Sequence, residues 1–266
     1  MPKTIAICNQ KGGVGKTTTA VNLAACLAVL ERKTLLIDID PQANSSQGVG
    51  INETQEEDIY EALALTENPE EATLERLSRI IKPVNPEYKL GNLGILPSSP
   101  GLAKLEMELV NAASRERRLQ RIIKAVETNY EYIVIDAPPS LNLLTINTLT
   151  AANSVIVPVQ CEYFSLQGVA ELLNTIKLVQ SNLNADLKIE GALLTMYDVR
   201  NSLSRQVVEE VRKNFPGRIF NTVIPRNVKL AEAPSHGKPI LLYDIQSTGS
   251  QAYMKLAEEI LEIANG

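Results

Sequence analysis

Residues 4–18, TIAICNQKGGVGKTT, contain the strongest structural signal in the chain. The first five of them form a short apolar run, which is typical of a buried strand. A glycine-rich turn at the end of a strand and the start of a helix exposes successive backbone N–H groups at the positive end of the helix dipole. Residues 17–30 predict that helix, with one apolar face formed by Val21, Ala24, Ala25, Ala28 and Val29. The sequence therefore predicts a phosphate-binding loop, with a glycine-rich turn that binds no ligand as the alternative.

The loop contains the residue types that nucleotide phosphates and Mg²⁺ require. Lys16 offers a cation to the β- and γ-phosphates, and the Thr17 hydroxyl is a natural Mg²⁺ ligand. The common phosphate-loop pattern has glycine where this chain has Gln10, and the chain carries a second lysine, Lys11, at the start of its loop. The residues expected to bind the nucleotide here are Lys11, Gly12, Gly13, Val14, Gly15, Lys16, Thr17 and Thr18.

Further apolar runs alternate with helical patterns along the rest of the chain. Strands buried on both faces and separated by helices indicate a parallel sheet between two helical layers. Strands are predicted at 33–38, 92–96, 132–136, 154–159 and 189–196, helices at 59–65, 69–81 and twice within 102–127, and a polar loop at 41–50. We therefore expect one α/β domain over residues 1–266, a doubly wound, mostly parallel sheet with helices on both faces.

Three aspartates stand where predicted strands end. Alternation along a strand puts Asp38 and Asp40 on the same side, and Asp136 ends another apolar run. The carboxyl ends of parallel strands are where α/β sheets bind ligands. A carboxylate at such a position can accept a hydrogen bond from a Mg²⁺-bound water or from Thr17. Solvated carboxylates at the ends of strands are the structural alternative.

The segment KGGVGKTT, with its two lysines, resembles the deviant Walker A loop of the ParA/MinD group of P-loop ATPases. This resemblance implies a weak Mg²⁺-dependent ATPase whose catalytic residues are Lys11, Lys16 and Asp40. Lys11 would reach the phosphates held by the partner subunit of a dimer, and Asp40 would position the attacking water. Thr17, Asp38 and Asp136 would serve the metal, and adenine would lie against Met196, Pro225 and Asn227.

Three longer segments, at 161–168, 193–200 and 224–240, look like the short Soj-type chromosome-partitioning proteins within this group. The loop begins at Lys11, which leaves no room for the N-terminal helix-turn-helix of the larger plasmid proteins. The resemblance implies an ATP-dependent homodimer that binds double-stranded DNA non-specifically and is stimulated by a ParB-like (Spo0J-like) protein. It also implies a cytoplasmic, nucleoid-associated protein.

The distribution of charge fits an interaction with DNA better than the total charge does. The chain carries a net charge of −5, yet residues 200–238 contain eight basic and three acidic residues. Binding through DNA phosphates needs basic residues but no reading of bases. The candidate DNA contacts are Arg200, Arg205, Arg218, Arg226, Lys229 and Lys238, whereas Arg212 and Lys213, within a predicted helix, are expected to be bystanders. Scattered solvated charges are the alternative.

Other functions remain open at this stage. A MinD-like positioning ATPase would need a basic amphipathic C-terminal helix at the membrane. Here the end of the chain, residues 253–266, has one lysine against three glutamates, and the spacing of Leu256, Ile260 and Ile263 fits docking on the protein's own core. No segment approaches the roughly 18 apolar residues of a membrane span. A metabolic synthetase and a scaffold that binds nucleotide without hydrolysing it are further alternatives.

The cysteine and histidine content argues against other kinds of site. The three cysteines, Cys8, Cys26 and Cys161, are widely spaced and are expected to be buried thiols. A single histidine, His236, makes a multi-histidine metal site or histidine-based catalysis improbable.

Overall fold

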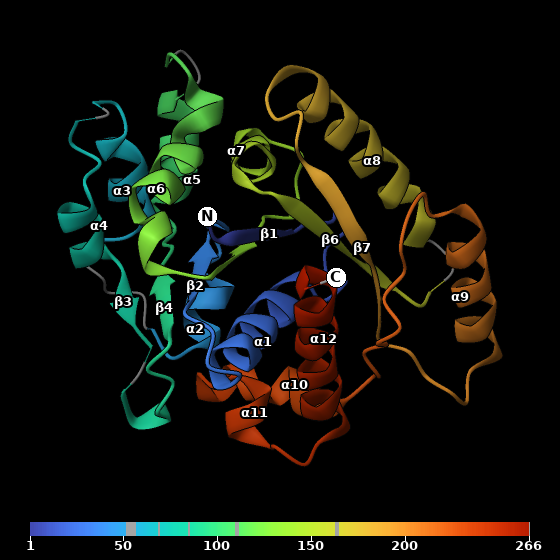
Figure 1. Cartoon of the computed structure of the whole chain (residues 1–266). Helices are drawn as coiled ribbons and strands as arrows, with labels where there is room; N and C mark the ends of the chain where they lie inside the picture. Colours follow the sequence, from blue (N-terminus) through green and yellow to red (C-terminus); the bar gives the residue numbers. More distant parts are fainter. Residues whose placement is uncertain (52–56, 69, 85, 110–111, 163–164, 266) are drawn as a thin grey trace.

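A seven-stranded sheet runs through the computed structural model, which describes residues 1–51, 57–68, 70–84, 86–109, 112–162 and 165–265 (Figure 1). The order of the strands across the sheet is β3, β4, β2, β5, β1, β6, β7. All neighbouring strands are parallel except β3 and β4. The strands are β1 Lys3–Ile7, β2 Thr34–Asp38, β3 Lys82–Pro83, β4 Leu93–Leu96, β5 Tyr132–Asp136, β6 Ser154–Gln160 and β7 Lys188–Thr195. The predicted mostly parallel α/β sheet is confirmed.

Helices cover both faces of this sheet (Figure 1). On one face lie α1 Lys16–Val29, α2 Asn44–Gly48, α10 Val228–Glu232, α11 Ile240–Tyr243 and α12 Thr248–Asn265. On the other lie α3 Ile59–Leu65, α4 Leu74–Ile80, α5 Leu102–Glu108, α6 Arg118–Val126, α7 Leu143–Ala151, α8 Ser165–Asn182 and α9 Ser202–Asn214. Alternation along the strands divides the core between these two faces, since Ile5 and Ile7 pack with α1 and Ala6 packs with α8.

The C-terminal helix α12 packs along α1. Its Leu256 and Ile260 are fully buried in the core beneath α1, and Ile263 is partly buried there, as their spacing predicts. The Tyr253 and Thr19 hydroxyls join the two helices at 3.1 Å. Among the described residues, no helix combines the length and apolar character needed to cross a membrane. The apolar face of α12 packs against α1 and the core of the protein itself.

Three local expectations are wrong. The helix expected at 69–81 begins only at Leu74, as α4, because the Thr73 hydroxyl caps it by accepting from the Arg76 N–H; Pro69 lies outside the described residues. Residues 41–50 contain α2 rather than loop alone, because distant carboxylates supply acceptors for its first residues: Ser45 donates to Asp136, and the Ser46 N–H donates to Asp38. Val29, expected on the buried face of the first helix, is 44% exposed, because it is the last residue of α1 and core burial ends at Ala28.

The three cysteines are free and buried, as expected. Burial raises the pKa of the Cys8 thiol to about 12 and that of Cys161 to about 11. Because the thiolate is the reactive form, these side chains behave as small apolar residues at neutral pH.

Candidate functional site

The phosphate loop connects β1, in the middle of the sheet, to α1. Gly13 and Gly15 adopt left-handed backbone angles, with φ of +72° and +89°, which explains glycine at these positions. Gly15 is the N-cap of α1 and offers no side-chain cap, and the first turn of the helix has no acidic residue. The N–H groups of Lys16, Thr17 and Thr18 are therefore left for an anion.

The two lysines of the loop occupy different environments. Lys16 is 7% exposed, and its Nζ donates to the backbone oxygen of Lys11 at 3.1 Å. Burial lowers the pKa of Lys16, while the nearby Asp136 carboxyl opposes this shift. The Lys11 side chain is only half-buried and forms no ion pair within the described part of the chain. Lys16 thus lies inside its own loop, and Lys11 lies at the rim.

Asp38 and Asp136 lie side by side at the ends of β2 and β5. Both are fully buried, and burial raises the pKa of each carboxyl, with the charge of Asp136 adding to the effect on Asp38. Asp38 accepts hydrogen bonds from the Ser46 N–H and hydroxyl, both at 2.8 Å, and from the Asp40 N–H at 3.2 Å. Its oxygens are already used to hold the segment that carries Asp40 and α2.

Asp136 retains an unused oxygen. Its Oδ2 accepts from the Ser45 hydroxyl at 2.7 Å, while its Oδ1 is buried and has no hydrogen-bond partner among the described residues. The Thr17 hydroxyl is near enough to lower the pKa of this carboxyl, although burial outweighs it. An orphaned carboxylate oxygen beside a threonine hydroxyl fits the hard oxygen ligands and ligand waters that Mg²⁺ prefers.

Asp40 lies two residues beyond the end of β2, and its N–H donates to the Asp38 carboxylate at 3.2 Å. It is 6% exposed, and its Oδ1 accepts from the Gln42 N–H at 3.0 Å. Its backbone oxygen accepts from the Ser98 hydroxyl at 2.8 Å, which fixes this segment to the end of β4. The carboxylate has a second oxygen available for a water molecule.

Beside the loop lies a cavity of about 350 Å³ that brings together the residues expected to contact the base. Gly15 and Thr18 line its phosphate end, and Met196, Pro225 and Asn227 line the rest with several apolar side chains. Met196 has a left-handed φ of +53°, and its sulfur accepts from the Gln160 amide at 3.3 Å. An apolar slot next to a phosphate loop suits a planar base.

Asn227 has a structural function that the sequence pattern did not predict. Its Oδ1 caps α10 by accepting from the Lys229 N–H at 2.8 Å, and its Nδ2 donates to the Thr248 hydroxyl at 2.7 Å. These two bonds hold α10 and α12 at the wall of the cavity. The second hydrogen of the Asn227 amide is left for a ligand.

Four further residues support the site and were missed at the sequence level. Thr195 donates from its hydroxyl to the backbone oxygen of Val14 at 2.9 Å and so ties the loop to β7. Ser45, Ser46 and Ser98 anchor the aspartates as described above. Thr195 is 181 residues from Val14, and no local motif marks any of the four.

The six candidate DNA contacts do not form one uniform basic patch. Three of them have acidic partners in the same chain: Arg200 with Asp198, Arg226 with Glu162 and Lys229 with Glu232. Lys238 is half-buried, with its ammonium 6.0 Å from the centre of the Tyr88 ring. Arg205 and Arg218 are exposed and have no ion pair among the described residues.

The position of α9 separates these candidates further. Arg200 precedes this helix near the carboxyl end of β7, whereas Arg218 follows it, with its backbone oxygen bonded to the Ala192 N–H in the middle of β7. The expected bystanders, Arg212 and Lys213, are exposed in the last turn of α9. A DNA contact along this side would therefore follow the length of α9.

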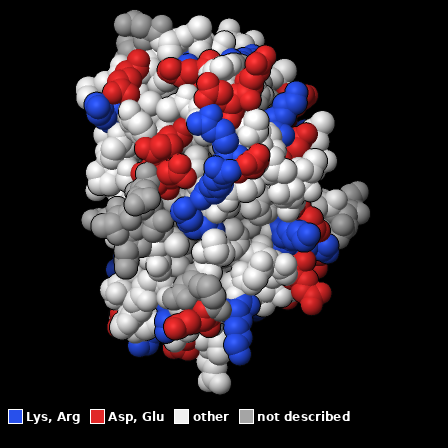
Figure 2. Space-filling model, turned by 90° about the vertical axis from the view of Figure 1, so that its left-hand side faces the viewer, with Lys and Arg blue, Asp and Glu red and all other residues white. Residues whose placement is uncertain are grey.

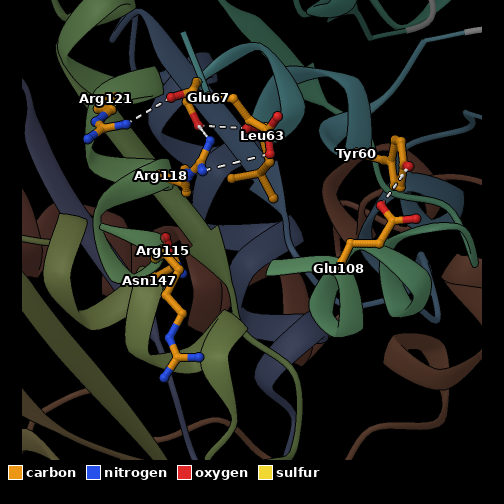
Figure 3. A network of polar contacts seen from close by, with 9 residues as sticks. Tyr60, Leu63, Glu67, Glu108, Arg115, Arg118, Arg121 and Asn147 are labelled. Atoms are coloured by element: carbon orange, nitrogen blue, oxygen red, sulfur yellow. Dashed lines mark hydrogen bonds and ion pairs between the residues drawn. The ribbon is translucent and has the colours of Figure 1, made fainter. Parts of the chain in front are cut away.

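Several charged side chains outside residues 200–238 form ion pairs with one another. On the face that carries α3 and α4, acidic and basic side chains are interspersed (Figure 2). Ion pairs join Arg76 to Glu71 and Arg79 to Glu75. The arginines of α6 turn inward to the end of α3: Arg121 donates to the Thr66 backbone oxygen at 2.8 Å, and the nearly buried Arg118 faces Glu67 (Figure 3). These arginines hold helices together.

Comparison with known sequences identifies close relatives over the whole chain. A family model described as an AAA domain matches residues 2–189. The sporulation initiation inhibitor protein Soj of Bacillus subtilis is 54% identical over 267 residues, which cover 100% of both chains. The chromosome partitioning protein ParA of Myxococcus xanthus is 49% identical over 97% of this chain and 87% of that protein.

Solved structures share the complete fold. Cobyrinic acid a,c-diamide synthase from Mycobacterium smegmatis, with a bound ATP analogue and magnesium, matches with a TM-score of 0.85 and 33% identity, over 100% of this chain and 97% of that chain. The septum site-determining protein MinD from Pyrococcus horikoshii, in complex with Mg-ADP, matches with a TM-score of 0.74 and 27% identity, over 99% and 98% of the two chains. Both relatives hold an adenine nucleotide and magnesium.

Proposed function

The chain belongs to the Soj/ParA family of chromosome-partitioning ATPases, and from this premise we propose that it is a DNA-partitioning switch driven by ATP. The observation that carries the proposal is the uncapped glycine loop, which leaves the first N–H groups of α1 open to phosphate beside a cavity of about 350 Å³ for the base. ATP binding closes two subunits into a dimer, the dimer binds DNA, and hydrolysis releases it.

Phosphate binding rests on the loop and on Lys16. The N–H groups of the first turn of α1 hold the phosphate oxygens, and Lys16 exchanges its bond to the Lys11 backbone oxygen for the β- and γ-phosphates. Met196, Pro225 and Asn227 line the wall against the base.

Thr17 and Asp136 are the residues best suited to Mg²⁺, through the hydroxyl and through the orphaned Oδ1 that could accept from a metal-bound water. The ion, when bound with the nucleotide, would neutralise charge on the phosphate oxygens. Asp38, expected to serve the metal, already accepts three hydrogen bonds, and we propose that it acts through α2 and Asp40.

Hydrolysis requires both subunits. Asp40 orients or deprotonates the attacking water with its available oxygen, a role that typically contributes about 10²–10⁴-fold in rate. Lys11, at the rim of the loop, reaches the phosphates bound by the partner subunit. A cation supplied in trans is worth about 10³–10⁵-fold in phosphoryl transfer and makes turnover conditional on dimerisation.

DNA binding by the dimer is electrostatic and independent of sequence. We place Arg205 and Arg218 first among the contacts because they are exposed and unpaired within the described residues. Arg200, Arg226, Lys229 and Lys238 contribute after their internal partners are displaced. A ParB-like protein would stimulate hydrolysis, and the protein would associate with the nucleoid in the cytoplasm.

A phosphate-release assay with and without duplex DNA tests this proposal, combined with light scattering in ATP and in ADP. Lys16→Ala should lose nucleotide binding, the dimer and DNA binding. Asp40→Ala should keep ATP, lose at least about 10²-fold in turnover and remain a DNA-bound dimer. Lys177→Ala, an exposed lysine on α8, is the matched control and should behave as wild type. Normal turnover by Asp40→Ala would refute the role given to Asp40.

A synthetase activity is the second candidate, because the matched Mycobacterium structure is described as a cobyrinic acid a,c-diamide synthase. If such a reaction formed a covalent intermediate on this chain, it would need an activated nucleophile with a base beside it. Here the only histidine, His236, stacks on Tyr243, and all three cysteines are buried. Phosphate release that depends on DNA favours the switch, whereas release that depends on a carboxylic acid and an ammonia donor favours the synthetase.

A further inference from the structure

The turn that leads from β1 into the phosphate loop is held by one buried side chain, that of Asn9. Asn9 is 3% exposed and lies two residues before Lys11. Its Nδ2 donates to the backbone oxygen of Pro158 in β6 at 2.7 Å, and its Oδ1 accepts from the Lys11 N–H at 3.0 Å. Both functions of the amide are used, one on each side of the turn.

The bond to Pro158 replaces a backbone hydrogen bond that β1 does not form with β6 at this point. The last backbone bond from this end of β1 to β6 runs from the Cys8 N–H to the Ile156 oxygen at 3.1 Å. In a parallel ladder the next N–H, two residues later, would donate to Pro158. The chain has left the sheet by then, and the Asn9 amide satisfies the buried Pro158 oxygen instead. The loop can therefore depart at Asn9 without leaving a polar group unpaired.

The second bond of Asn9 fixes the backbone of Lys11. The Lys11 backbone oxygen accepts from Lys16, but Lys16 turns to the phosphates when ATP binds. The bond from the Lys11 N–H to Asn9 is then the side-chain bond that still holds the Lys11 backbone. Helix α8 closes the remaining space: a Cβ added at Gly168 would lie 3.6 Å from the Asn9 Oδ1 and 3.8 Å from the Lys11 Cβ. The direction in which the Lys11 side chain leaves the loop is thus set by Asn9 and α8.

We propose that Asn9 is a positioning residue for Lys11, and that it acts on the active site of the partner subunit rather than on its own. The inference rests on the proposed function, in which Lys11 reaches the partner's phosphates. A displacement of about 1 Å at a catalytic group can cost roughly 10²-fold in rate. Loss of the Asn9 bonds should therefore lower turnover strongly and leave nucleotide affinity almost unchanged, because the loop N–H groups and Lys16 remain.

Complementation between two defective subunits tests the inference. Asn9→Ala protein is mixed with an equal amount of Asp40→Ala protein before ATP and duplex DNA are added. In a mixed dimer, the site of the Asn9→Ala subunit keeps its own Asp40 and receives a correctly held Lys11 from the other subunit. About half of randomly formed dimers are mixed, and each has one competent site, so turnover should recover to roughly a quarter of wild type.

Two pairs of variants make the outcome specific. Lys11→Ala mixed with Asp40→Ala must recover in the same way, since it reports the action of Lys11 in trans. Asn184→Ala, which removes two side-chain hydrogen bonds far from the loop, controls for loss of stability and should keep its own turnover. Asn9→Leu, which fills a similar volume without a donor or an acceptor, carries the test if Asn9→Ala fails to fold.

Each result decides one question. Recovery in both mixtures, with ATP affinity of the Asn9 variant within about threefold of wild type, supports the inference. Recovery with Lys11→Ala but not with the Asn9 variant shows that Asn9 serves its own site, which overturns the inference and leaves the proposed function intact. No recovery with Lys11→Ala refutes the trans lysine and the inference together. Wild-type turnover by the Asn9 variant alone also overturns the inference.

Discussion

Replacing Gly237 with alanine should destabilise the protein by roughly 2–5 kcal/mol, because two left-handed glycines meet at this point. Gly237, in the segment that precedes α11, has φ of +62°, and a Cβ built on it would lie 2.9 Å from the Cα of Gly50. Gly50 follows α2 and has φ of +83°. Neither backbone can move away freely, since the Tyr88 hydroxyl donates to the Gly237 oxygen at 3.0 Å and the Gly50 N–H donates to the Gln47 oxygen at 2.9 Å.

The expected magnitude combines three effects. A left-handed conformation costs an alanine about 1 kcal/mol or more. Overpacking against a backbone atom typically costs about 1–3 kcal/mol, and a weakened Tyr88 hydrogen bond up to about 1 kcal/mol. For a protein of this size, the melting temperature should fall by roughly 5–10 °C. Gly50 follows α2, whose Ser45 and Ser46 hydroxyls donate to Asp136 and Asp38. A shift of Gly50 would therefore disturb these aspartates, and ATP turnover should fall as well.

Thermal unfolding followed by circular dichroism measures this effect, with Gly91→Ala as the matched control. Among the described residues, Gly91 has no atom within 4 Å of an added Cβ, and its φ is not left-handed, so its variant should melt within about 2 °C of wild type. A Gly237→Ala protein that melts with the Gly91→Ala control would show that the contact between the two glycines does not constrain the fold.

Three further predictions concern assembly, DNA and the thiols. Gly12→Ala should fold and bind ATP normally, because an added Cβ would have no atom of the described residues within 4 Å. It should nevertheless fail to dimerise in light scattering, since the side chain obstructs the meeting of two loops, and a normal ATP dimer would contradict this. Arg218→Ala should weaken DNA binding and reduce the slope of log K against log salt concentration by about 1–2 per dimer, whereas Arg212→Ala should change neither. Equal DNA affinities of Arg218→Ala and wild type at low salt would exclude the contact. The native thiols should resist iodoacetamide at neutral pH, because burial raises the pKa of Cys8 and of Cys26 to about 12 and leaves little thiolate. Rapid labelling without denaturant would contradict the buried placement.

Local sequence patterns predict the strands and the phosphate loop well, because the information needed is contained in adjacent residues. The apolar run before Lys11, the glycines with left-handed angles and the helix from Lys16 follow from backbone sterics and periodicity. The aspartates at the ends of β2 and β5 follow from the rule that parallel strands end at one edge. Helix α2 cannot be predicted from adjacent residues, because its first turn depends on Asp136, which lies 91 residues from Ser45.

The basic residues show why charge counts along the sequence have limited value. The window 200–238 is basic by composition, yet Glu162, outside it, pairs with Arg226, and Asp198, just before it, pairs with Arg200. The fold brings Glu162 to Arg226 across 64 residues of sequence, whereas Asp198 lies only two residues from Arg200. An exposed ion pair is worth less than about 1 kcal/mol, so a DNA phosphate can displace its acid. The measured salt slope, rather than the count of lysines and arginines, will therefore report how many of the six candidates contact DNA.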